Sequence, residues 1–121
     1  MGFKSGTARL FGKESRMAWF ALILAGLLEI VWAYSMKQSE GFTRVGPATV
    51  AIVTMVASFA LLAIAMRTLP LGTAYTVWTG IGALGALAVG MIVLGEPAGG
   101  MRLFAALLIL TGLVMMKLGS P

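Results

Sequence analysis

One acidic side chain, Glu29, stands in the middle of an apolar run, within the sequence AGLLEIVWA. A carboxylate inside a membrane helix is costly unless it is paired, protonated or hydrated, and such residues mark proton and ion sites. The other acidic residues, Glu14, Glu40 and Glu96, lie outside the apolar runs. We therefore predict that Glu29 binds protons or a cation. The alternative is a protonated carboxyl that bonds a neighbouring helix and has only a structural role.

Helical spacing surrounds this carboxylate with small and aromatic residues. Positions three and four apart share a helix face, so Gly26 and Trp32 lie beside Glu29. Two further runs present comparable faces, which hold Thr54, Met55 and Ser58 in one and Tyr75, Trp78, Thr79 and Gly82 in the other. An acid, aromatic rings and hydroxyl groups suit an organic cation, because rings add cation–π contacts. For Tyr75 and Trp78 the alternative is an aromatic belt at the membrane interface.

The elements that position these residues are four apolar runs. Of the 121 residues, 60% are apolar and 11% are charged, whereas a soluble domain has roughly 45–50% and 25%. A membrane span needs about 20 apolar residues, and lipid forces the backbone of each span into a helix. The sequence therefore predicts an all-α integral membrane protein with four transmembrane helices joined by short turns, over residues 17–36, 45–66, 71–94 and 101–116.

Composition also excludes several functions. The chain has no cysteine and no histidine, which removes disulfides, thiolate metal sites and imidazole chemistry. No nucleophile–base pair and no metal-binding set is recognisable, so we expect neither an enzyme nor a cofactor. The net charge of +5 comes from cations at the ends of the apolar runs, not on one polar face. This pattern indicates a chain in a lipid bilayer and argues against a nucleic acid as partner.

The first sixteen residues are basic and are treated as a segment separate from a membrane domain over residues 17–121. We expect a disordered or interfacial tail; the alternative is that Met17 is the natural start. Membrane orientation follows from the cations beside the spans. From Met17 onward, two cations lie on the N-terminal side and three on the other, which permits insertion either way. With the tail the count is six against three and favours a cytoplasmic N-terminus.

Small residues in the third and fourth runs suggest packing contacts. The segment Gly80-Ile-Gly-Ala-Leu-Gly85 matches a dinucleotide-binding fingerprint, but that motif needs a preceding strand, which an apolar helix cannot supply. We instead expect a kink or close packing at Gly80 and Gly82. Ala105 and Gly112 are seven residues apart and lie on one helix face, which makes them a candidate seam between two subunits.

Three stretches carry a resemblance to a known family: AGLLEIVWAYSMKQSEGFTR, RTLPLGTAYTVWTGIGALGA and the short LGEP loop. From Met17 to its end the chain resembles the small multidrug resistance family. The Glu-Ile-Val-Trp and Thr-Gly-Ile-Gly segments resemble its guanidinium-exporter branch more than the branch that exports quaternary ammonium drugs. The basic N-terminal segment is not part of the family pattern.

The resemblance implies an antiparallel homodimer of four-helix subunits in the inner membrane of a prokaryote. Both copies of Glu29 would lie in one site and exchange protons for cations by alternating access. Ser58 would orient Glu29 by a hydrogen bond, Trp32 would limit the size of the pocket, and the remaining lining would come from Gly26, Met55, Tyr75, Trp78 and Thr79. A dimer also fits the size of the chain, because one four-helix subunit is too small to enclose a substrate between two gates.

Three functions remain open at this point. The first is proton-coupled export of guanidinium and small guanidinyl cations, and the second is export of bulky quaternary ammonium drugs by the same machinery. The third is a small structural or pore-forming membrane protein, which does not need one buried carboxylate among aromatic rings. A heterodimer with a paralogue is an alternative to the homodimer.

Overall fold

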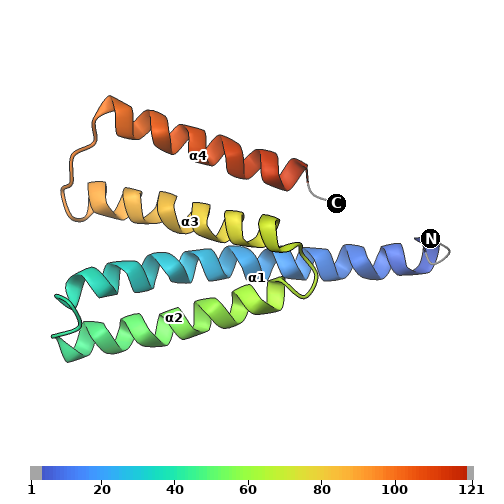
Figure 1. The fold of residues 1–121 in the computed structure, drawn as a ribbon, viewed down its shortest axis with the longest axis horizontal. Helices are drawn as coiled ribbons and strands as arrows, with labels where there is room; N and C mark the ends of the chain where they lie inside the picture. Colours follow the sequence, from blue (N-terminus) through green and yellow to red (C-terminus); the bar gives the residue numbers. More distant parts are fainter. Residues whose placement is uncertain (1–3, 120–121) are drawn as a thin grey trace.

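The computed structural model describes residues 4–119, with side chains from Ser15 onward. Four helices follow one another, and this part of the chain contains no strand: α1 (Lys4–Gln38), α2 (Val45–Ala65), α3 (Leu71–Ile92) and α4 (Gly100–Leu118). The chain reverses at each connection, so α1 and α3 run in the same direction (Figure 1). The α1–α2 and α3–α4 connections lie together at one end of the bundle, which we call the loop end.

All four helices are long and apolar enough to cross a membrane, with candidate spans Ser15–Gln38, Val45–Ala65, Leu71–Ile92 and Gly100–Leu118. The predicted four-span helical fold is therefore confirmed. Helix α1 begins at Lys4, so the described part of the predicted tail continues the first helix. Nothing in this stretch forces a break, because α1 contains no proline. The division of the chain at Met17 stays a prediction, and residues 1–3 lie outside the described part.

The α1–α2 connection is a tight turn built around Ser39. Its buried hydroxyl donates to the carbonyl of Met36 at 2.7 Å and accepts from the backbone N–H of Phe42 at 3.0 Å. Three consecutive residues, Glu40, Gly41 and Phe42, have positive φ angles of 50°, 76° and 66°. Only Gly41 adopts this region without a steric penalty, so hydrogen bonds around Ser39 offset the cost at its two neighbours.

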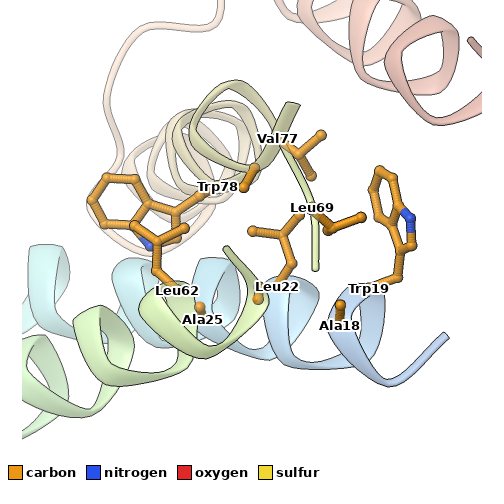
Figure 2. Packing of buried hydrophobic residues seen from close by; sticks show 10 residues of the cluster. Ala18, Trp19, Leu22, Ala25, Leu62, Leu69, Val77 and Trp78 are labelled. Carbon is orange, nitrogen blue, oxygen red and sulfur yellow. The ribbon is translucent and has the colours of Figure 1, made fainter. Parts of the chain in front are cut away.

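The packed interior lies among α1, α2 and α3. Ala18, Trp19, Leu22 and Ala25 of α1 meet Leu62 and Ala65 of α2 and Ala74, Val77 and Trp78 of α3, with Leu69 from the α2–α3 connection. Figure 2 shows Trp19 and Trp78 at opposite ends of this cluster. Lipid tails are as apolar as these side chains, so close van der Waals packing holds the helices together. Alanine at four of these positions is what permits that proximity.

Helix α4 packs differently, since none of its residues is buried. It meets α3 where the partly buried Leu113 lies against Gly80, in space that a Cβ at this glycine would fill. It meets α1 through Lys117, whose Nζ lies 4.7 Å from the centre of the Trp19 ring. Ala105 and Gly112 are both exposed, and no atom lies within 4 Å of a Cβ built at Gly112. The seam between subunits that these two residues suggested stays a prediction.

Candidate functional site

Glu29 lies at the interface of α1 and α3, with its carboxyl group against Gly82. A Cβ built at Gly82 would overlap that carboxyl group, at 2.6 Å from Oε2. The Oε2 atom is buried and has no hydrogen-bond partner among the described residues. Glu29 is also the only acidic residue in the four candidate spans. Glycine at position 82 therefore leaves the space that the carboxyl group occupies.

Two isoleucine–glycine contacts flank Glu29 along the same interface. Ile81 of α3 packs on Gly26 of α1, with its Cγ2 atom 2.7 Å from a Cβ built at that glycine. In the reverse sense, Ile30 of α1 packs on Gly85 of α3. Because the two helices run in the same direction, the Gly26–Ile81 contact lies on one side of Glu29 and the Ile30–Gly85 contact on the loop-end side.

Gly26 was predicted to line the site, whereas Ile30, Ile81 and Gly85 were not predicted to lie beside Glu29. A signal for them exists, because glycine precedes isoleucine by four residues in α1, and isoleucine precedes glycine by four residues in α3. Positions four apart share a helix face. On parallel helices, the isoleucine of each pattern can therefore lie against the glycine of the other.

A polar junction links the three packed helices one turn before Glu29. Ser58 of α2 is fully buried, and its hydroxyl donates to the carbonyl oxygen of Ala25 at 2.7 Å. Trp78 of α3 donates from Nε1 to the same hydroxyl at 3.0 Å. In an α-helix the carbonyl of residue 25 also accepts the N–H of residue 29. Ser58 therefore contacts the backbone that carries Glu29.

This arrangement differs from the predicted hydrogen bond between Ser58 and the Glu29 side chain. A serine hydroxyl has one proton to donate, and here that proton goes to Ala25. Sequence spacing placed Ser58 on a plausible face but could not show which acceptor on α1 lies opposite. The structure thus supports Ser58 as a residue that positions α1, through the backbone.

Aromatic side chains gather around Trp78. The Phe59 ring meets it edge to face, with centroids 5.7 Å apart, and the Tyr75 ring lies tilted at 5.6 Å. Trp78 is buried, whereas Tyr75 remains 53% exposed. Trp32 is half-buried one turn after Glu29, and its buried Nε1 has no acceptor among the described residues. The indoles of Trp32 and Trp78 thus differ, because only Trp78 is fixed by a hydrogen bond.

The remaining predicted lining residues are not all brought to Glu29 within one subunit. Met55 is half-buried on α2, three residues before Ser58. Thr79 and Tyr75 line a separate hollow of about 320 Å³ on the α4 side of α3, together with Thr76, Gly80, Ala83 and Ile109. Their membership of the substrate site stays a prediction that depends on what a second subunit adds.

The glycines of α3 serve close packing. Gly80 admits Leu113 of α4, and Gly82 admits the carboxyl group of Glu29. Both glycines lie inside one continuous helix, Leu71–Ile92. The kink expected at these positions stays a prediction, whereas the alternative, close approach of neighbouring side chains, is what the contacts show.

The electrostatic state of Glu29 follows from its lack of a partner. The only ion pair among the described residues joins Arg102 to Glu96 at the loop end, at 3.8 Å. An ionised carboxylate in a membrane span needs a counter-charge or a proton, and no Lys or Arg side chain between Ser15 and Gly119 forms an ion pair with Glu29. The site is therefore suited to hold either a proton or a cation that enters from outside.

Comparison with known proteins assigns this geometry to a family. The sequence model described as Small Multidrug Resistance protein matches residues 17–109. The chain belongs to the small multidrug resistance family. This member is 50% identical over 104 residues to the "Guanidinium exporter" of Escherichia coli (strain K12), which covers 86% of the chain and 99% of that relative. It is 51% identical, with the same coverage, to proteins of the same name from Citrobacter freundii and Salmonella typhimurium.

These findings confirm the family resemblance that the sequence carries. The relatives are bacterial transporters, and the chain is accordingly a multi-pass membrane protein of a transporter family. The matched region begins at residue 17 and includes α1 from Met17, all of α2 and α3, and part of α4. All residues of the polar junction and both isoleucine–glycine contacts lie inside it.

Proposed function

We propose that this protein exports guanidinium and small guanidinyl cations across the inner membrane in exchange for protons. The observation that carries the proposal is the Glu29 carboxyl group, which lies in a membrane span and whose buried Oε2 atom has no hydrogen-bond partner in the described part of the chain. The relatives named guanidinium exporter support this choice of substrate. The Glu29 carboxylate is then the only kind of binding group that an alternating-access cycle needs, because the proton and the cation compete for it.

Guanidinium suits this carboxylate for chemical reasons. It is planar, stays charged at neutral pH and offers paired N–H donors that match the two oxygens of a carboxylate. Binding of the cation expels the proton, and release of the cation lets a proton return. Trp32 would border the site and restrict its size, while Tyr75 and Trp78 would provide aromatic faces for the cation. Ser58 would fix the position of the α1 backbone next to Glu29, through its hydrogen bond to Ala25.

We propose that the working unit is an antiparallel homodimer with both copies of Glu29 in one site. One subunit buries no residue of α4, and a transporter needs a second half to close the site from the other side. Ala105 and Gly112 would form part of the contact between the two α4 helices. Two oppositely inserted copies of one chain reproduce the inverted symmetry that other transporters obtain by internal repeats.

The decisive experiment is proton release from purified protein in weakly buffered detergent solution. Addition of guanidinium should release protons from wild type and none from Glu29→Gln, which keeps size and hydrogen bonding but cannot titrate. The same variant in vesicles should lose guanidinium–proton exchange while gel filtration still reports a dimer. Wild-type exchange in Glu29→Gln would refute the proposal, and a guanidinium flux without proton movement would favour the pore alternative.

Export of quaternary ammonium drugs is the second candidate, because the family description itself names multidrug resistance. The two substrates differ in size and in hydrogen-bond donors, since a quaternary ammonium ion has none. Competition assays decide between them: tetraalkylammonium ions should compete with guanidinium only weakly if the proposal is right. A drug that displaces guanidinium at lower concentration than guanidinium itself would reverse the order of the two candidates.

A further inference from the structure

A cavity of about 380 Å³ lies between α1 and α3, on the loop-end side of Glu29. Its inner end is lined by Ile30 and Ala83, which directly follow Glu29 and Gly82 in the sequence. Ala33 and Ala86 continue the walls one turn further. The cavity thus begins one residue beyond Glu29 and Gly82 along the two helices, and small residues continue its walls.

The outer end of this cavity is polar. Tyr34 and Lys37 of α1 line it, together with Glu96 and Arg102 from the α3–α4 region. The Arg102–Glu96 ion pair is half-exposed on both sides. Charged groups at the end of a membrane span lie where water and lipid headgroups meet. Water can therefore enter this end, because it finds several polar partners there.

Ile30, the residue after Glu29, both lines the cavity and packs on Gly85 of α3. Along the two parallel helices the contacts follow in the order Gly26–Ile81, Glu29–Gly82 and Ile30–Gly85, and the cavity is lined from Ile30 and Ala83 toward the loop end. The tip of Ile30 fills the space that a side chain at position 85 would need. A rotation of this one side chain, or a small separation of the helices at Gly85, would join the cavity to Glu29.

We propose that this cavity is the aqueous route by which protons and substrate reach Glu29 from the loop end, and that Ile30 closes it in this conformation. The inference rests on the proposed function in one respect, because it takes Glu29 as the binding carboxylate. It adds a route and a closing residue that the binding chemistry alone does not require. The polar residues at the outer end then act as the first contact with bulk water.

The first test measures proton leak in vesicles under an imposed pH gradient without guanidinium. Ile30→Ala should raise the leak about tenfold over wild type, the change expected for a barrier lower by ~1.4 kcal/mol. Ile81→Ala is the matched control, because Ile81 also packs on a glycine next to Glu29 but does not line this cavity. It should leak like wild type. Equal leak in both variants, or no added leak in Ile30→Ala, would overturn the proposal.

The second test does not depend on either isoleucine variant being well folded. The natural chain has no cysteine, so single cysteines report cleanly in lipid nanodiscs, which expose both membrane faces. Ala86→Cys, on the cavity wall, should react rapidly with a small cationic methanethiosulfonate. Ala88→Cys, at the same depth on another face of α3, should react far more slowly. Equal rates at the two positions would show that the cavity holds lipid or protein and would end the proposal.

The two proposals fail separately in these experiments. If wild type exchanges guanidinium for protons but Ile30→Ala matches Ile81→Ala and Ala86→Cys is unreactive, only the route is wrong. If wild type moves no guanidinium while Ala86→Cys still reacts, the cavity is hydrated but the proposed substrate is wrong.

Discussion

Removal of the Ser58 hydroxyl gives a sharp test of how the polar junction positions Glu29. In Ser58→Ala, the buried Nε1 of Trp78 loses its acceptor at 3.0 Å, and the Ala25 carbonyl loses a donor at 2.7 Å. The carbonyl retains its helical hydrogen bond. The indole N–H, in contrast, is left without a partner. The main cost of the substitution therefore falls on Trp78.

The size of that cost depends on the membrane setting. A buried donor stranded in a soluble protein costs about 1–3 kcal/mol, but hydrogen bonds between membrane helices average ~0.6 and reach ~1.7 kcal/mol. The membrane range applies here, because the separated helices also find other partners. We expect Ser58→Ala to lower the free energy of unfolding by ~0.6–1.7 kcal/mol, which is roughly a threefold to twentyfold change in the unfolding equilibrium.

A double-mutant cycle with Trp78→Phe isolates this interaction. Phenylalanine has no N–H, so Ser58→Ala strands nothing in that background. Unfolding by sodium dodecyl sulfate in mixed micelles should therefore show that Ser58→Ala costs less, by about 0.6–1.7 kcal/mol, when Trp78 is already phenylalanine. Strict additivity of the two substitutions would refute the reasoning. Guanidinium exchange by the single variants, measured on protein confirmed to be dimeric, would then show how strongly transport depends on the position of α1.

Three further predictions concern the site and the N-terminal segment. Gly82→Ala should lose guanidinium binding and about 1–3 kcal/mol of stability, because its Cβ would overlap the Glu29 carboxyl group. Gly72→Ala is the control and should retain binding in the same titration, because a Cβ at position 72 meets nothing within 4 Å. Trp32→Ala should shift the ratio of kcat/KM from guanidinium toward bulkier cations by at least about tenfold, and an unchanged ratio would remove Trp32 from the site. A chain that starts at Met17 should insert in both orientations and the full chain should favour one, as labelling of loop cysteines would show; one fixed orientation of the shorter chain would rule out the antiparallel homodimer.

Much of the fold could be predicted because hydropathy alone determines the spans. The predicted starts of the second and third spans coincide with the observed helix starts at Val45 and Leu71. The ends differ by up to two residues, since a helix end depends on local hydrogen bonds that apolar composition does not report. Helix α1 is longer than its apolar run because a helix continues into polar sequence when nothing interrupts it.

The candidate site was predicted by residue type more successfully than by contact. A lone glutamate in an apolar run is visible in sequence, and so is a tryptophan one turn away. The acceptor of the Ser58 proton was not predictable, because it is a backbone carbonyl of another helix. Helical periodicity assigns faces within one helix but contains no information on the axial offset between helices. For the same reason, the spacing could not show that Thr79 lines the hollow beside α4.

The sparse packing of α4 has a consequence for how its sequence should be read. None of its side chains is buried by the rest of the described chain, so intrachain packing places few demands on most of its surface. In a saturation-mutagenesis map, tolerance along α1 and α3 would reflect the interior of one subunit. Intolerant positions on the outer face of α4 would instead report what surrounds the subunit. The fourth helix thus serves as a genetic probe of the neighbours that this chain meets in the membrane.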